Sequence, residues 1–194
     1  EPLEPRLLLN GSVGIPDDLL ILDAAEAPGP VLWVAQGPSP VTGGQVEGIT
    51  NSPVTGAIHA VAPHPTNVNI LYVGAVNGGV WKTTNATAAT PTWTPLTDEE
   101  VSLSISALEF DTTDGTYETL VAGIGRYSSF GWRGGAREGL LRTDDGGATW
   151  TELDGGGTLD GTNISGLAVR GSVIVAAVDD TGSGGGIYRS DDTG

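Results

Sequence analysis

The sequence contains no cysteine and a single lysine, Lys82. The absence of cysteine excludes disulfide bonds, thiolate metal sites and cysteine nucleophiles, so the stability of the chain must come from packing. Because only 8 basic residues stand against 24 acidic ones, no basic stripe could neutralise a phosphate backbone, and nucleic acid is not an expected partner. The net charge of −16 repels anionic membrane surfaces and favours solubility.

Long apolar runs are missing as well, since none approaches the roughly 18 residues of a membrane-spanning helix. We therefore expect no insertion into a membrane. Sustained helical periodicity is also absent. Glycine (31 residues) and proline (12 residues) are abundant instead, which is typical of many tight turns between short strands.

Three segments of the chain repeat one pattern of β-forming runs. The first run is an apolar alternation and the second is rich in β-formers. The third run consists of a glycine, two apolar residues, a cation and a hydroxyl. The first runs are residues 58–61, 105–108 and 164–167; the second are 70–74, 119–123 and 173–177; the third are 79–83, 139–143 and 186–190; and fourth runs follow at 92–96 and 149–153. The spacing of the copies is close to the roughly 40 to 50 residues of a four-stranded propeller blade.

The turn after the third run carries a family resemblance. Residues 143–150, Thr-Asp-Asp-Gly-Gly-Ala-Thr-Trp, resemble the Asp-box, Ser/Thr-x-Asp-x-Gly-x-Thr-Trp, of sialidase-like (BNR) repeats. The resemblance implies an all-β fold, a partial β-propeller of four-stranded antiparallel blades, with about three blades in residues 50–194 and the last incomplete. The implied structural residues are Thr143, Asp145, Gly147 and Trp150 in this box and Ser190, Asp192 and Gly194 in the next.

The residues of the Asp-box predict how its turn is stabilised. We expect the Asp145 carboxylate to accept backbone N–H groups within the turn, Gly147 to supply a positive φ, and Trp150 to pack between neighbouring sheets. Thr83-Thr84-Asn85, followed by Trp93, resembles a degenerate copy with asparagine in place of aspartate.

The first third of the chain lacks the repeat. Residues 1–30 form a predicted N-terminal arm, in which residues 3–9 resemble the Leu-Glu-Pro-Arg-x-Leu-Leu signature near the start of large bacterial surface and secreted proteins. That resemblance implies a long extracellular or cell-surface parent chain from a bacterium. Residues 31–49 contain a candidate propeller-closing strand and a linker. About three blades cannot close a ring, so the missing blades lie outside this sequence or the unclosed blade edges associate with another copy.

The sequence offers little for catalysis. Sialidase activity would need, by the resemblance, three arginines for the substrate carboxylate, a Tyr/Glu pair and an acid, and the family's Arg-Ile-Pro opening is missing. Arg142 and Arg189, with Lys82, recur at one repeat position, which indicates a structural role such as pairing with acids on the adjacent strand. Xyloglucanase-type hydrolases share the repeat and place an acid where this chain has Asn77, whose amide cannot relay a proton as a carboxylic acid does.

Metal sites are weakly indicated. His59 and His64 make a poor metal pair without further ligands, and we expect one in a strand hydrogen bond and the other in a turn. Asp111 and Asp114 could coordinate calcium through their oxygens or simply cap a turn, because the full spacing of a calcium loop is missing. No other cofactor is expected.

The insertion at residues 126–137 combines aromatic and arginine side chains among glycines, a composition enriched at recognition sites. It is either a binding surface for a glycan or a protein partner at the cell surface, or an aromatic plug over the propeller face. We interpret the chain as a non-enzymatic binding or structural module of a larger secreted protein. The alternative is a sialidase-like or xyloglucanase-like glycoside hydrolase with its catalytic residues in blades absent here. The candidate ligand-binding residues are Arg126, Tyr127, Phe130, Trp132 and Arg133.

Overall fold

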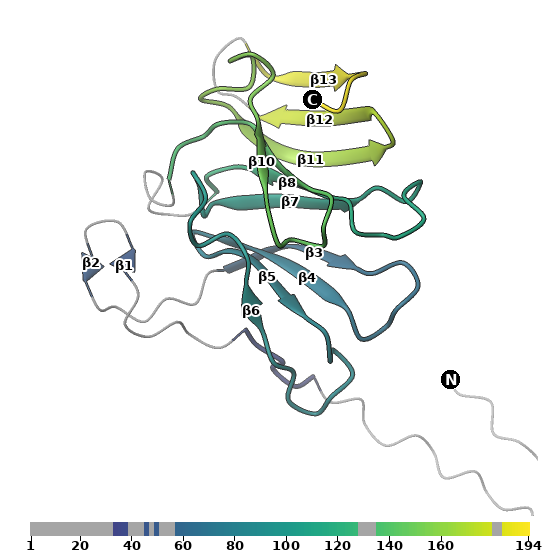
Figure 1. Cartoon of the computed structure of the whole chain (residues 1–194). Coiled ribbons are helices and arrows are strands. Elements are labelled where there is room, and N and C mark those ends of the chain that lie inside the picture. The colour runs from purple at the N-terminus through teal and green to yellow at the C-terminus, as the bar shows by residue number, and fades with distance from the viewer. Residues whose placement is uncertain (1–32, 39–44, 47–48, 51–56, 128–134, 180–183) are drawn as a thin grey trace, which may run out of the picture. The chain divides into compact units, whose positions relative to one another are not determined.

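A computed structural model describes residues 33–38, 45–46, 49–50, 57–127, 135–179 and 184–194 (Figure 1). The chain divides into two units, residues 1–35 and 36–194, and all of the strands belong to the second unit. No helix occurs in these ranges, and therefore none there that is long and apolar enough to cross a membrane. The predicted N-terminal arm, 1–30, lies outside the described residues.

Three antiparallel sheets follow one another along the chain (Figure 1). The first sheet has strands β3 (Ala57–Pro63), β4 (Leu71–Val76), β5 (Gly79–Thr83) and β6 (Thr94–Pro95); the second has β7 (Ile105–Phe110), β8 (Leu120–Ile124), β9 (Leu140–Thr143) and β10 (Thr151–Leu153); the third has β11 (Asn163–Arg170), β12 (Val173–Asp179) and β13 (Gly186–Ser190). Each sheet pairs its strands in sequence order. The prediction of an all-β, partial β-propeller fold with four-stranded antiparallel blades is confirmed, with three strands described in the third sheet.

The segment before the first sheet is simpler. Strands β1 (Gln45–Val46) and β2 (Ile49–Thr50) form a two-stranded hairpin. Residues 33–38, which belong to the candidate closing strand, have no regular secondary structure. The peptide bond between Gly37 and Pro38 is cis.

One irregularity recurs at the same place in the first strand of every sheet. The register shifts between Ile58 and Ala60 in β3, between Ile105 and Ala107 in β7, and between Ile164 and Gly166 in β11. A β-bulge kept at one position identifies the three isoleucines as equivalent residues of one repeated sheet.

Their burial nevertheless differs. Ile105 and Ile164 are fully buried, whereas Ile58 is 40% exposed. Ile105 packs against β4 of the preceding four-stranded sheet and Ile164 against β8, while only the two-stranded β1–β2 hairpin precedes β3 among the described residues. Burial of this position is therefore decided by the neighbouring sheet and not by its own strand.

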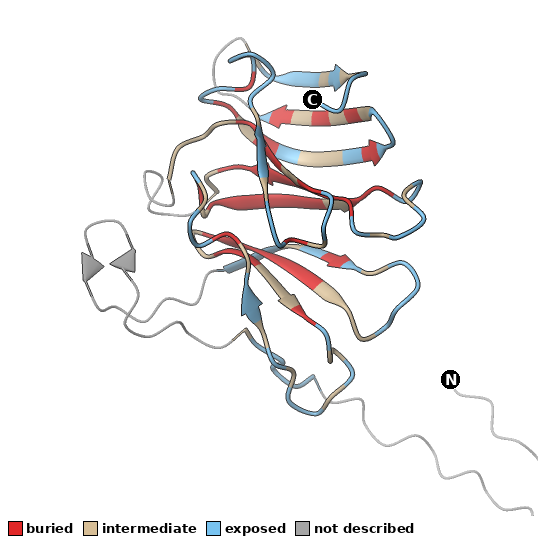
Figure 2. Ribbon diagram, viewed as in Figure 1, coloured by how far each residue is buried: buried red, intermediate tan, exposed pale blue. Residues whose placement is uncertain are grey.

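The core lies between sheets and not within a closed ring. One apolar cluster joins the first and second sheets through residues such as Tyr72, Val80 and Leu141, and a second joins the second and third sheets through Leu140, Ile164 and similar residues. Figure 2 shows the burial concentrated in β4, β7 and β8, with β13 largely exposed. The two apolar clusters thus join each sheet to its neighbour.

Candidate functional site

The turn between β9 and β10 is closed by two side chains. The Thr143 hydroxyl donates to Asp145 Oδ1 at 2.8 Å, and Thr143 Oγ1 accepts the Gly147 N–H at 2.9 Å. Asp145 accepts the Thr149 N–H on Oδ1 at 2.9 Å and the Thr149 hydroxyl on Oδ2 at 2.7 Å. These bonds, led by those from Thr149, hold the pKa of Asp145 well below its ordinary value. Gly147 has a φ of 94°, which favours glycine.

A hydroxyl bonded to a side-chain oxygen two residues on also follows the third strand of the other two sheets. The Ser190 hydroxyl donates to Asp192 Oδ1 at 2.6 Å, and Ser190 Oγ accepts the Gly194 N–H at 2.9 Å. In the first sheet the Thr83 hydroxyl donates to Asn85 Oδ1 at 2.9 Å, and that oxygen also accepts the Thr92 N–H at 2.9 Å. The amide oxygen of Asn85 therefore makes the hydrogen bonds in this turn that a carboxylate makes in the other two.

The β9–β10 turn also connects two sheets. The Gly146 carbonyl accepts the Tyr72 hydroxyl at 2.8 Å and the Lys82 ammonium at 3.0 Å, both from the first sheet. The Lys82 Nζ lies 5.0 Å from the centre of the Tyr72 ring, a cation–π distance. The turn thus fastens the second sheet to the first.

The recurring cations have partners other than those expected. Arg142 pairs with Asp144 at 3.4 Å, and Arg189 pairs with Asp191. Each acid lies two residues further along, in the turn that the arginine's own strand enters, and not on the adjacent strand. Exposed pairs of this kind contribute little to stability, so their role is local.

The Asp111 and Asp114 carboxylates cap the loop between β7 and β8. Asp111 Oδ1 accepts the N–H and hydroxyl of Thr113, and its Oδ2 accepts the Gly171 N–H from the third sheet at 3.0 Å. Asp114 accepts from both groups of Thr116 and from the Thr119 N–H, and these bonds hold its pKa well below the ordinary value.

The histidines occupy separate environments. His59 Nδ1 lies 2.7 Å from the Ser106 carbonyl in the second sheet, and His64 Nδ1 accepts the N–H groups of Thr66 and Asn67 in a turn. No cluster of three potential metal ligands occurs in the described parts of the chain.

Of the five predicted ligand-binding residues, Phe130, Trp132 and Arg133 lie outside the described residues. Hydrogen bonds hold the described residues at both ends of this loop. The Arg126 N–H donates to Asn163 Oδ1 of the third sheet at 2.9 Å, and the Arg126 guanidinium donates to the Gly135 carbonyl. The Arg137 carbonyl accepts the Gly161 N–H at 2.8 Å. The two ends of the loop are therefore fixed to each other and to the sheets.

Tyr127 lies inward from this loop. Its ring stacks on His59, with centroids 5.2 Å apart and planes 1° from parallel. The Tyr127 hydroxyl is buried without a hydrogen-bond partner among the described residues. Burial, and then the charge of Asp179, raise the pKa of Tyr127, and the nearby Ser165 hydroxyl offsets only part of this. Tyr127 thus anchors the base of the loop.

Asn77 and the acids Glu138 and Glu152 bear on the hydrolase alternative. Asn77, with a φ of 64°, accepts the Ser104 hydroxyl on Oδ1 at 2.9 Å. Partial desolvation and the neighbouring carboxyl of Glu138 raise the pKa of Glu152. Sequence reasoning missed this contact, because Glu138 precedes β9 and Glu152 lies in β10, and only the tertiary structure brings them together.

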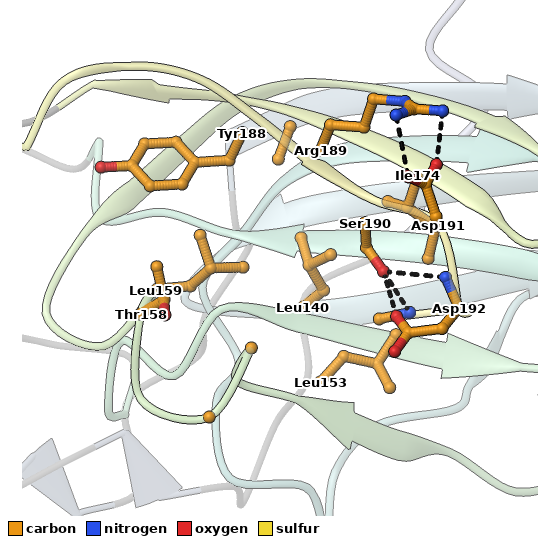
Figure 3. A pocket seen from close by; sticks show the side chains of 14 residues that line it. Leu140, Leu153, Thr158, Leu159, Ile174, Tyr188, Arg189, Ser190, Asp191 and Asp192 are labelled. Carbon is orange, nitrogen blue, oxygen red and sulfur yellow. Dashed lines mark hydrogen bonds and ion pairs between the residues drawn. The ribbon is translucent and has the colours of Figure 1, made fainter.

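A pocket that the sequence did not indicate lies between the second and third sheets (Figure 3). Its volume is about 560 Å³. Apolar side chains form the floor, and the Ser190–Asp192 turn forms part of the rim. The apolar lining includes Leu140, Leu153, Leu159, Ile174 and Tyr188.

The chain matches no protein-family model and no curated protein. In fold it is similar to solved structures of two GH74 enzymes. One is an ancestral GH74 enzyme, with 19% identity, a TM-score of 0.49 and coverage of 71% of this chain and 17% of that one. The other is the GH74 xyloglucanase from Xanthomonas campestris, with 15% identity, a TM-score of 0.50 and coverage of 69% and 20%. The chain spans a fifth or less of the length of either, and at these identities the likeness shows the fold alone.

Proposed function

We propose that the chain is a non-enzymatic recognition unit of a larger extracellular or cell-surface bacterial propeller protein, and that residues 126–137 bind a glycan. The observation that carries this proposal is that hydrogen bonds fix both ends of the loop. Arg126 bonds to Asn163 and to Gly135, and Arg137 bonds to Gly161. A loop with fixed ends loses less conformational entropy when it binds a ligand.

The composition of the loop points to the ligand class. Phe130 and Trp132 are aromatic and Arg133 is a multiple hydrogen-bond donor, and such residues are enriched where binding energy concentrates. Carbohydrate as the ligand is further supported by the name of the Xanthomonas campestris neighbour, a xyloglucanase.

A glycan array with the full chain tests the proposal. Phe130→Ala and Trp132→Ala should each weaken binding of the best glycan by at least about tenfold. Val68→Ala is the matched control, because Val68 is 78% exposed and lies in the β3–β4 loop. Binding that all three variants leave unchanged would exclude this loop as the site.

Hydrolysis of a glycan is the second candidate function, favoured by the activity in the name of that same neighbour. Against it, Asn77, whose side chain accepts the Ser104 hydroxyl, stands where the related hydrolases place an acid. Release of reducing sugar from xyloglucan, or of sialic acid from a sialylated glycan, by the chain would decide for an enzyme.

A further inference from the structure

The bulge in the first strand of each sheet holds one residue at the same repeat position: His59 in β3, Ser106 in β7 and Ser165 in β11. A bulge re-aims the side chain of its extra residue, and bulges are over-represented beside functional sites. His59 and Ser165 are exposed, whereas Ser106 is buried. The bulges of β3 and β11 thus present an imidazole and a hydroxyl to solvent.

One hydrogen bond determines the tautomer of His59. Its Nδ1 lies 2.7 Å from the Ser106 carbonyl oxygen. Because a carbonyl oxygen can only accept, Nδ1 carries the proton, and Nε2 of the neutral ring holds a lone pair. His64 has the opposite arrangement, since its Nδ1 accepts the N–H groups of Thr66 and Asn67. His59 Nε2 is therefore a hydrogen-bond acceptor, and the backbone of the second sheet keeps it in that form.

Tyr127 fixes the plane of the same imidazole. The two rings are parallel, with centroids 5.2 Å apart. Space for the Tyr127 ring depends on Gly125, since a Cβ built there would lie 2.7 Å from Tyr127 Cε2. The His59 ring is thus held by a hydrogen bond in its plane and by a stacked ring on its face, both from the second sheet. An acceptor fixed in this way loses little conformational entropy when it binds a ligand.

The third sheet places a carboxylate beside this stack. Asp179 pairs with Asn163 across β12 and β11, and Asn163 Oδ1 accepts the Arg126 N–H at 2.9 Å. Burial, and then the charge of Asp179, raise the pKa of Tyr127. The Arg126 guanidinium donates to the Gly135 carbonyl. Tyr127 therefore contacts an imidazole of the first sheet and lies within electrostatic range of a carboxylate of the third.

We propose that His59 determines the specificity of the glycan site: its Nε2 accepts a hydrogen bond from a hydroxyl of a neutral sugar, and Asp179 repels sugars that carry a carboxylate. This inference rests on the proposed function, since it concerns the glycan bound beside residues 126–137. Sugar hydroxyls donate to acceptors of this kind, whereas a carboxylate only accepts and has the same charge as Asp179. The net charge of −16 adds to that repulsion.

Matched pairs of glycans on an array test the specificity. The pairs are lactose with sialyllactose, and cellotetraose with the same oligosaccharide oxidised to its uronic acid form. At about pH 8, where an ordinary histidine is neutral, the chain should bind at least one neutral member. The neutral member should bind at least about tenfold more tightly than its acidic counterpart. Tighter binding of the acidic members, or binding of neither neutral sugar, would overturn the proposal.

NMR spectroscopy observes the acceptor directly. The chain has two histidines, and long-range proton–nitrogen correlations distinguish the tautomers of their rings. We expect the proton on Nδ1 of His59 and on Nε2 of His64. Saturation with the neutral sugar that binds more tightly, lactose or cellotetraose, should shift the Nε2 resonance of His59 and leave the His64 ring unchanged. A proton on Nε2 of His59 in the free chain would refute the assigned role.

Two variants separate the acceptor from the ring stack. His59→Gln supplies an amide oxygen in place of Nε2, whereas His59→Phe keeps a ring against Tyr127 and has no acceptor. His59→Phe should weaken binding of the same neutral sugar by at least about tenfold, and His59→Gln by less than about threefold. Binding by His59→Phe as tight as that by His59→Gln would show that only ring packing matters. Circular dichroism and thermal unfolding check that both variants are folded.

Asp179→Asn tests the exclusion of acidic sugars. It should bring the affinity for the acidic member of the pair to within about threefold of that for the neutral member. Glu118→Gln is the matched control, because it removes the same charge from an exposed position in the β7–β8 loop, at the other end of β8. An equal gain in both variants would assign the exclusion to the net charge of the chain and not to Asp179.

The outcomes distinguish this inference from the proposed function. Weaker glycan binding by Phe130→Ala and Trp132→Ala, with no effect of His59→Phe, would leave the proposed function standing and overturn the role of His59. Absence of binding to every glycan on the array would overturn both.

Discussion

Gly123 on β8 leaves the space that Ile164 of β11 occupies, since a Cβ built on Gly123 would lie 2.6 Å from Ile164 Cγ2. The first interface has the same arrangement, with Ile105 Cγ2 2.5 Å from a Cβ built on Gly74. Both isoleucines are fully buried. A glycine in the second strand of one sheet thus sets how closely the next sheet approaches.

Replacing this glycine should separate the sheets. Gly123→Ala should lower the free energy of unfolding by about 1 to 3 kcal/mol, because an extra methyl group in a packed interface forces neighbours to move. Urea denaturation measures the change. Gly115→Ala is the control, since nothing lies within 4 Å of a Cβ built there. Equal stability of the two variants would refute the packing argument.

Removing the Thr143 hydroxyl should weaken the β9–β10 turn. The Thr143 side chain is 1% exposed and bonds both Asp145 and Gly147. Thr143→Val keeps the shape and leaves the Gly147 N–H unpaired, so we expect a loss of about 1 to 3 kcal/mol of unfolding free energy. Thr151→Val, at an exposed position of β10, should change it little. A Thr143→Val protein as stable as the parent would contradict this role.

Acid should unfold the protein in part through its turn aspartates. The folded-state pKa of Asp145 is lowered, as are those of Asp114 and Asp192. Their stabilisation is therefore present above the unfolded-state pKa of about 4 and is lost as the pH falls below it. Asp145→Asn should flatten the fall of Tm between about pH 4 and pH 2, because Asn85 closes the equivalent turn without a charge. An unchanged slope would show that Asp145 does not contribute.

Glu152 should have the opposite effect on how stability depends on pH. Its folded-state pKa is raised by partial desolvation and by Glu138, so its stabilisation is present at low pH and is lost as the pH rises through the folded-state pKa. Glu152→Gln should therefore raise Tm at pH 7 and leave it nearly unchanged at pH 3. Glu118→Gln, an exposed position, serves as the control. A lower Tm of Glu152→Gln at pH 7 would contradict a raised pKa of Glu152.

Much of the fold follows from short-range patterns. The runs at 79–83, 139–143 and 186–190 became β5, β9 and β13 with nearly the predicted limits, because alternation and turn glycines are local signals. The Thr143 and Asp145 hydrogen bonds span only a few residues, so these bonds could also be predicted from the sequence. The partners of Arg142 and Arg189 were predicted incorrectly, because side-chain geometry at a strand end cannot be read from the repeat position.

The sequence by itself determined the repeated sheets and the turns that close them, since each depends on residues close together in the chain. Only the tertiary structure decided what lies between sheets: the burial of Ile105 and Ile164, the stacking of Tyr127 on His59, and the pocket beside Tyr188. These features join residues from different repeats. Their energy depends on the shapes of two surfaces in contact, which no pattern within one repeat encodes.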